Sequence, residues 1–173
     1  KLKVVKLKSM AETLLFIQKH DFADFDALSD YVDTASAKTK ELTAKIKAAE
    51  NRMAEIAVLK THIINYAKTR DIYTAYRKAG YSRKYYDAHE SDILIHKAAK
   101  KAFDDLALKK LPTVKSLQAE YSDLLVQKKL DYAELSKARD EAKQLQIYRA
   151  NAEMLLRTDA EEQRQTREHQ QEK

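Results

Sequence analysis

The chain has 173 residues and a formal net charge of +6, and it contains one glycine, one proline and no cysteine. A β-sheet protein of this length needs many more turn residues, because hairpin turns require a positive or a fixed φ angle. The composition therefore excludes a sheet fold, disulfides and thiolate metal sites, and no apolar run approaches the roughly 18 residues of a membrane span, so we expect an all-α cytoplasmic protein without a membrane partner.

The first segment, residues 1–22, is predicted to form one amphipathic helix. Its apolar residues recur near helical spacing, at Leu7, Met10, Leu14, Leu15 and Ile17. The sequence HDFADFD then interrupts this pattern. Asp24 or Asp26 can cap the next helix by accepting hydrogen bonds from its free N–H groups.

A second, much longer helix is predicted over residues 26–79, where nothing in the sequence stops a helix. We expect Gly80 to end it as a left-handed cap. Apolar residues recur in a 4-3-4-3 pattern, which is typical of a coiled-coil seam. This seam continues through a three-residue step and consists of Leu42, Ile46, Ala49, Met53, Ile56, Leu59, Ile63 and Tyr66.

A small helical tip is predicted over residues 80–112. Ser82 can cap one or two shorter helices, and Pro112 fits the start of the following helix, where its missing N–H has no cost. That last helix, over residues 113–157, carries a second near-heptad seam of Leu117, Tyr121, Leu125, Lys128, Tyr132, Leu135, Ala138, Ala142, Leu145, Tyr148, Ala152 and Leu155. The polar tail, residues 159–173, is expected to be disordered.

Two apolar seams of similar length flank the tip. We therefore expect residues 26–79 and 113–157 to pair as the shafts of a long antiparallel coiled-coil hairpin that occupies residues 23–158. The segment from Lys68 to Lys115 holds 12 basic and 6 acidic side chains, whereas the rest of the chain holds 21 of each. The whole positive excess is thus predicted to lie around the tip.

Residues 66–86 combine six of the ten tyrosines with six basic residues and one acid, Asp71. Basic side chains neutralise phosphates and aromatic rings stack on bases, so this combination favours a nucleic-acid or partner-binding surface. The candidate binding residues are Lys68, Arg70, Tyr73, Tyr76, Arg77, Lys78, Tyr81, Arg83, Lys84 and Tyr85. Alternatively, the tyrosines pack the core of the tip and the basic residues form its solvated face.

Catalytic and metal-binding patterns are missing from the sequence. His89 and His96 are seven residues apart, whereas zinc sites on a helix more often use i, i+3 or i, i+4 spacing. Carboxylates such as Asp87, Glu90 and Asp92 fit ion pairs with lysines one helical turn away. We therefore predict no catalytic residue, no metal and no cofactor.

The tip and the segment that follows it resemble a known family. HIINYAKTRDIYTAYRKAGYSRKYYDAHESDILIHKAAKKAF and LKKLPTVKSLQAEYSDLLVQKK are similar to the C-terminal region of mobilisation relaxases, which are carried by bacterial conjugative and mobilisable transposons. LKSMAETLLFIQKHDFADFDAL and ELTAKIKAAENRMAEIAVLK match the same region more loosely, so the resemblance extends to about Arg157.

The resemblance implies a role in conjugative DNA transfer. A relaxase nicks one strand at the transfer origin with a tyrosine nucleophile, and a histidine cluster that holds a divalent metal assists the reaction. No H-x-H signature of that nuclease is present, and none of the tyrosines has the required setting. The family therefore implies a non-catalytic region behind the nuclease, whose partners are origin DNA, relaxosome proteins or the coupling protein.

Three hypotheses follow for the function. The first is a relaxase accessory domain that binds origin DNA or a partner protein through the tip. The second is a structural coiled-coil spacer or dimerisation module without nucleic-acid contact, in which Leu135, Leu145 and Leu155 hold a homodimer together. The third is an enzyme in its own right, for which the sequence offers no support.

Overall fold

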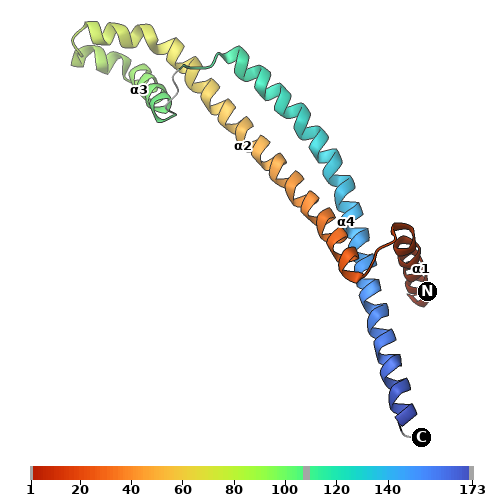
Figure 1. The fold of residues 1–173 in the computed structure, drawn as a ribbon. Helices are drawn as coiled ribbons and strands as arrows, with labels where there is room; N and C mark the ends of the chain where they lie inside the picture. The colour runs from red at the N-terminus through yellow and green to blue at the C-terminus, as the bar shows by residue number, and fades with distance from the viewer. Residues whose placement is uncertain (1, 107–109, 172–173) are drawn as a thin grey trace. The chain divides into compact units, whose positions relative to one another are not determined.

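The structure is a computed structural model that describes residues 2–106 and 110–171, and this part of the chain is entirely helical (Figure 1). Its four helices are α1 (Leu2–His20), α2 (Phe25–Lys78), α3 (Arg83–Asp105) and α4 (Val114–Gln171). The prediction of an all-α fold is confirmed. Within the described residues, no helix combines the length and the apolar character that crossing a membrane requires.

Internal contacts divide the chain into two compact units. Unit 1 consists of residues 1–45 and 131–173, and unit 2 consists of residues 46–130. The two long helices α2 and α4 contribute to both units, and the predicted hairpin of residues 23–158 is thereby divided between them.

Unit 1 is built from α1, the start of α2 and the greater part of α4. Its core contains Leu28, Val32, Leu145 and Ala152. Ion pairs from Asp33 to Arg149 at 2.7 Å and from Lys38 to Glu134 at 2.9 Å show that the two long helices run antiparallel here. Asp24 caps α2, because its Oδ1 accepts a hydrogen bond from the Ala27 N–H at 2.8 Å.

Unit 2 is built from the second half of α2, the whole of α3 and the start of α4. Its core contains Ile56, Leu59 and Leu117, against which Ile63 and Phe103 pack. Apolar seam residues from both long helices thus meet as the periodicity predicts. In this unit as well, pairs between α2 and α4 have antiparallel order, among them Arg52 with Glu120 and Glu50 with Lys128.

The seam of α4 differs from the prediction at one position. Tyr132 is 48% exposed, whereas the neighbouring Asp131 is only 7% exposed. The steps from Asp131 to Leu135, Ala138, Ala142 and Leu145 alternate between four and three residues, which keeps a regular heptad seam against α2. The predicted seam contained Tyr132 in place of Asp131 and was therefore irregular at this point. The prediction that Tyr132 faces α2 was wrong.

Helix boundaries show three further differences. Ser82 occupies the N-cap position of α3 but makes no side-chain capping hydrogen bond. Pro112 lies outside α4, and Thr113 caps that helix by accepting a hydrogen bond from the Ser116 N–H at 3.0 Å. The tail expected to be disordered continues α4 to Gln171, which fits its content of strong helix formers and its lack of glycine and proline.

Candidate functional site

A four-residue reversal, residues 79–82, joins α2 to α3. Gly80 and Tyr81 both adopt positive φ angles, of 63° and 61°. The Tyr81 N–H donates to the Tyr76 carbonyl at 3.0 Å, and the Gly80 N–H donates to the Arg77 carbonyl at 3.1 Å. These two bonds form a Schellman motif, in which Gly80 is the left-handed residue, as the sequence predicts.

Six basic side chains lie in the last three turns of α2 and the first turn of α3, and all six are exposed: Lys68, Arg70, Arg77, Lys78, Arg83 and Lys84, together called the basic surface. Arg70 pairs with Asp71 at 3.3 Å and Arg83 pairs with Asp87 at 2.8 Å. Among the described residues, the other four make no ion pair. Four cationic groups of the basic surface therefore face solvent without an internal counter-charge.

The ends of the two helices affect these cations differently. Arg77 and Lys78 lie in the last turn of α2, where the negative end of the helix dipole favours positive charge. Arg83 and Lys84 lie in the first turn of α3, which contains no acidic residue, and there the dipole disfavours positive charge. Fold stability thus accounts for Arg77 and Lys78, and the ion pair with Asp87 accounts for Arg83, whereas neither accounts for Lys84.

The tyrosines of the tip mostly pack inside unit 2. Tyr76 is buried, and its ring contacts those of Tyr73, Tyr81, Tyr85 and Tyr86 at centroid distances of 5.2–6.3 Å. Tyr81 alone among these rings is largely exposed, at 57%. The structure therefore places the candidate residues Tyr73, Tyr76 and Tyr85 in an internal aromatic cluster and leaves Tyr81 available at the surface.

A buried histidine, which the sequence analysis considered only as a metal ligand, completes this cluster. His96 is only 3% exposed, and its ring stacks between Tyr66 at 4.5 Å and Tyr73 at 4.3 Å. Its Nδ1 lies 3.1 Å from Thr69 Oγ1. Burial lowers the pKa of His96, and the positive charge of Lys100 lowers it further. The sequence contained one signal for this buried position. Tyr66, Thr69 and Tyr73 are spaced i, i+3 and i+7, so they share one face of α2.

The two histidines of α3 do not form a metal pair. His89 lies at the kink of α3 and packs on Tyr85 with 4.4 Å between ring centroids, whereas His96 stacks on the rings from α2. Within the described parts of the chain, no group of three or more histidine, aspartate or glutamate side chains is placed to hold a metal ion.

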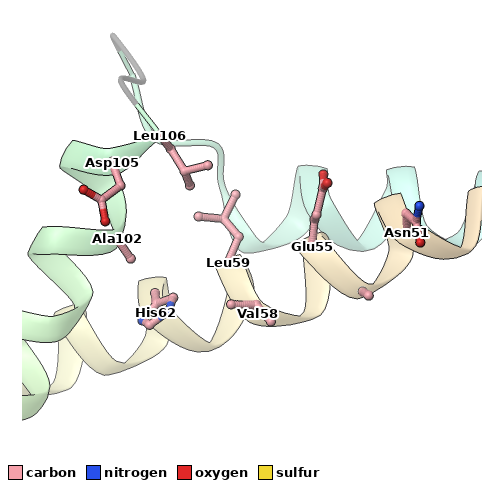
Figure 2. A pocket seen from close by; sticks show the side chains of 9 residues that line it. Asn51, Glu55, Val58, Leu59, His62, Ala102, Asp105 and Leu106 are labelled. Carbon is pink, nitrogen blue, oxygen red and sulfur yellow. The ribbon is translucent and has the colours of Figure 1, made fainter. Parts of the chain in front are cut away.

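An open groove of about 650 Å³ lies between α2 and the end of α3 in unit 2 (Figure 2). Figure 2 shows Leu59 and Leu106 close together at its centre. The rim carries Glu55, His62 and Asp105. The groove is a shallow apolar depression with isolated polar groups, and it shares no residue with the basic surface.

The comparisons with known proteins give no match, whether with family models, with curated proteins or with solved structures.

Proposed function

We propose that this chain is a non-catalytic DNA-binding module that contacts the phosphate backbone through the basic surface. The observation that carries the proposal is the group of six exposed cations in the last three turns of α2 and the first turn of α3, four of them without an ion-pair partner among the described residues. Lysine and arginine side chains in such a group release condensed counterions when they bind phosphates, and this release drives association.

The distribution of charge between the units supports the same proposal. Unit 2 has 17 basic and 10 acidic residues, whereas unit 1 has 16 basic and 17 acidic residues. A nucleic acid is therefore attracted to unit 2 and not to unit 1. Lys84 adds a second argument, because it lies at the positive end of α3, where the helix dipole disfavours a cation, and makes no ion pair among the described residues.

The resemblance to relaxases suggests which DNA this is. On that basis we propose that the chain supports DNA mobilisation in the bacterial cytoplasm, as the C-terminal helical domain of a relaxase. The ligand is then the transfer origin of a mobile element, and relaxosome or coupling proteins are further partners. The nicking chemistry belongs to a nuclease domain elsewhere in the parent protein, so the purified chain is expected to leave an origin oligonucleotide uncut.

The test removes four charges from the basic surface. The variant Arg77→Gln, Lys78→Gln, Arg83→Gln, Lys84→Gln is compared with the wild type for binding to a labelled duplex across a series of salt concentrations. We expect a loss of affinity of about 10-fold or more at low salt. The slope of log affinity against log salt should become less steep by about 2 to 4, because each phosphate contact contributes about 0.9 to the size of this slope.

A matched control removes the same charge from unit 1. Lys40, Lys137, Arg139 and Lys143 are exposed, and their replacement by glutamine changes the net charge equally. This control should bind DNA with nearly wild-type affinity. Equal losses in the two variants would show that only total charge matters, and a wild-type chain without salt-sensitive binding would refute the DNA contact.

A further inference from the structure

Helix α1 turns an apolar face to solvent. Val4, Leu7, Ala11, Leu14 and Leu15 are all exposed, and their spacing of i, i+3, i+7, i+10 and i+11 places them on one face, called here the outer face of α1. Leu7 is the most exposed of them, at 70%. The sequence predicts an amphipathic helix, and the structure shows that much of its apolar side is not covered within unit 1.

The opposite face of α1 is fixed in place by polar contacts. The Asn151 side-chain amide of α4 donates to the Ser9 carbonyl at 3.3 Å, to Ser9 Oγ at 2.9 Å and to Thr13 Oγ1 at 2.9 Å. Thr13 is completely buried and donates to the Ser9 carbonyl at 2.8 Å. A helix that buries a threonine and exposes its leucines has a specified orientation, because rotating it would orphan these buried polar groups.

An apolar hollow lies beside the outer face. It has a volume of about 250 Å³, and Leu14 and Leu156, both exposed, belong to its lining together with Ile17, Phe22, Phe25, Leu28, Ala152, Leu155 and one charged residue, Asp24. Leu14 is therefore shared between the hollow and the outer face. The two features form one continuous apolar surface of unit 1.

We propose that this surface is the interface with a second copy of the chain, formed by two antiparallel α1 helices around a two-fold axis at Ala11. That axis places position i of one helix opposite position 22 − i of the other. Leu7 of each copy then lies opposite the partner's Leu15, next to the partner's hollow. The small side chain of Ala11 at the axis lets the two helices approach closely.

The charges that flank the outer face are self-complementary in this arrangement. Lys8 and Glu12 lie on the same side of the apolar stripe, one helical turn apart, and form a loose pair at 3.9 Å within the chain. In an antiparallel pair, the side of the stripe that carries Lys8 and Glu12 in one copy faces the same side of the other copy. Lys8 therefore reaches the partner's Glu12, and the two-fold axis repeats this contact. One interface thus gains two reciprocal ion pairs.

The sequence suggested Leu135, Leu145 and Leu155 for a dimer; Leu135 and Leu145 are buried in unit 1 and are not available, whereas Leu155 is half-buried and lines the hollow. The apolar stripe is small compared with the roughly 800 Å² per partner of a stable complex, so we expect a weak, concentration-dependent dimer.

Sedimentation of the whole chain over a concentration series tests the proposal. We expect a shift from monomer toward dimer as the concentration rises to about 100 µM. Leu7→Glu should abolish the shift and leave the helical circular dichroism unchanged, because Leu7 makes no core contact. Val126→Glu, a matched control at a similarly exposed residue of unit 2, should dimerise like the wild type.

Charge complementation tests the two-fold axis itself. Lys8→Glu and Glu12→Lys should each weaken the dimer, and an equimolar mixture of the two should form heterodimers of wild-type strength or better. A monomer at every concentration would overturn the proposal, as would a dimer that Leu7→Glu leaves intact. Leu7-dependent binding to anionic vesicles by a chain that stays monomeric would also overturn it and assign the surface to a membrane.

Discussion

Unit 1 and unit 2 each join two helices through a polar side chain, but only one of these side chains can gain a charge. In unit 1 the amide of Asn151 joins α4 to Ser9 and Thr13 of α1. In unit 2 the imidazole of His96 joins α3 to Thr69 of α2, between two tyrosine rings. Both contacts fix the orientation of one helix against another, because a buried polar group without its partner is costly.

The comparison indicates that the two units respond to pH differently. An amide does not titrate, so the contacts of Asn151 with α1 are independent of pH. Protonating His96 places a charge in a buried position, close to the positive charge of Lys100. Protonation of His96 therefore weakens unit 2, which carries the basic surface.

The largest effect is expected for Asn151→Asp. The amide donates to three oxygens of α1, and a carboxylate cannot donate to any of them, so we expect a loss of about 1–3 kcal/mol in the stability of unit 1. Hydrogen exchange of the α1 amides should report it. Asn51→Asp, the same change at an exposed residue of unit 2, is the control. Unchanged protection of α1 would show that its apolar contacts alone hold it.

A smaller effect is expected from the titration of His96. Its pKa in the folded protein lies below the ordinary value of 6.5, so the unfolded chain binds the proton more readily. The stability of unit 2 should therefore begin to fall as the pH drops through about 6.5, and keep falling until the folded-state pKa is passed.

His96→Phe should flatten this dependence. A phenyl ring can keep the stacking between Tyr66 and Tyr73, and Thr69 Oγ1 retains its hydrogen bond to the Asn65 carbonyl at 2.7 Å. Urea unfolding monitored in unit 2 between pH 7.5 and pH 5 provides the measurement, with unit 1 amides as an internal reference. Parallel pH profiles for the two proteins would rule out His96 as the source.

The smallest effect is expected from the ion pairs between α2 and α4. Arg52 in unit 2 contacts both carboxylate oxygens of Glu120, at 2.7 and 3.2 Å, and the Glu120 hydrogen bond is the main cause that raises the pKa of Arg52. Both side chains are more than 40% exposed, so solvent limits the coupling energy to about 1 kcal/mol or less. A double-mutant cycle with alanine measures it.

The corresponding pair in unit 1 is the natural reference for this cycle. Lys38 and Glu134 lie 2.9 Å apart, but each is more than half exposed. A lysine makes a point contact, whereas the arginine of unit 2 holds both oxygens of its carboxylate. We expect a smaller coupling in unit 1 and a decrease in both with added salt. Equal couplings would mean that the two-point geometry has no energetic consequence.

Local rules were sufficient for most of the helical framework. A chain with one glycine and one proline has few places to end a helix, so Gly80 located the end of α2, and the seam from Leu42 to Leu59 identified its buried face. Local rules failed at Tyr132, because hydrophobicity alone ranks a tyrosine above an aspartate, whereas pairing with α2 decides which of two neighbouring residues faces inward.

The candidate site was only partly predictable for a related reason. Exposure of the six basic residues follows from their charge, and the structure agrees with it. Whether a tyrosine is buried or exposed depends on the side of α2 against which α3 packs, and this is a property of the tertiary structure. His96 is buried only because Tyr66 and Tyr73 enclose it, and α1 exposes leucines only because Asn151 binds its polar side.

The Schellman motif at Gly80 has a consequence for the speed and the strength of the proposed DNA binding. Two hydrogen bonds and the packing of Tyr81 on Tyr76 fix the backbone between Arg77 and Arg83 before any ligand arrives. Association then immobilises only side chains, and the entropy of ordering a loop is not lost at that moment. A pre-organised backbone of this kind suits rapid, reversible contacts that exchange along a polyanion more than a slow fit to a single sequence.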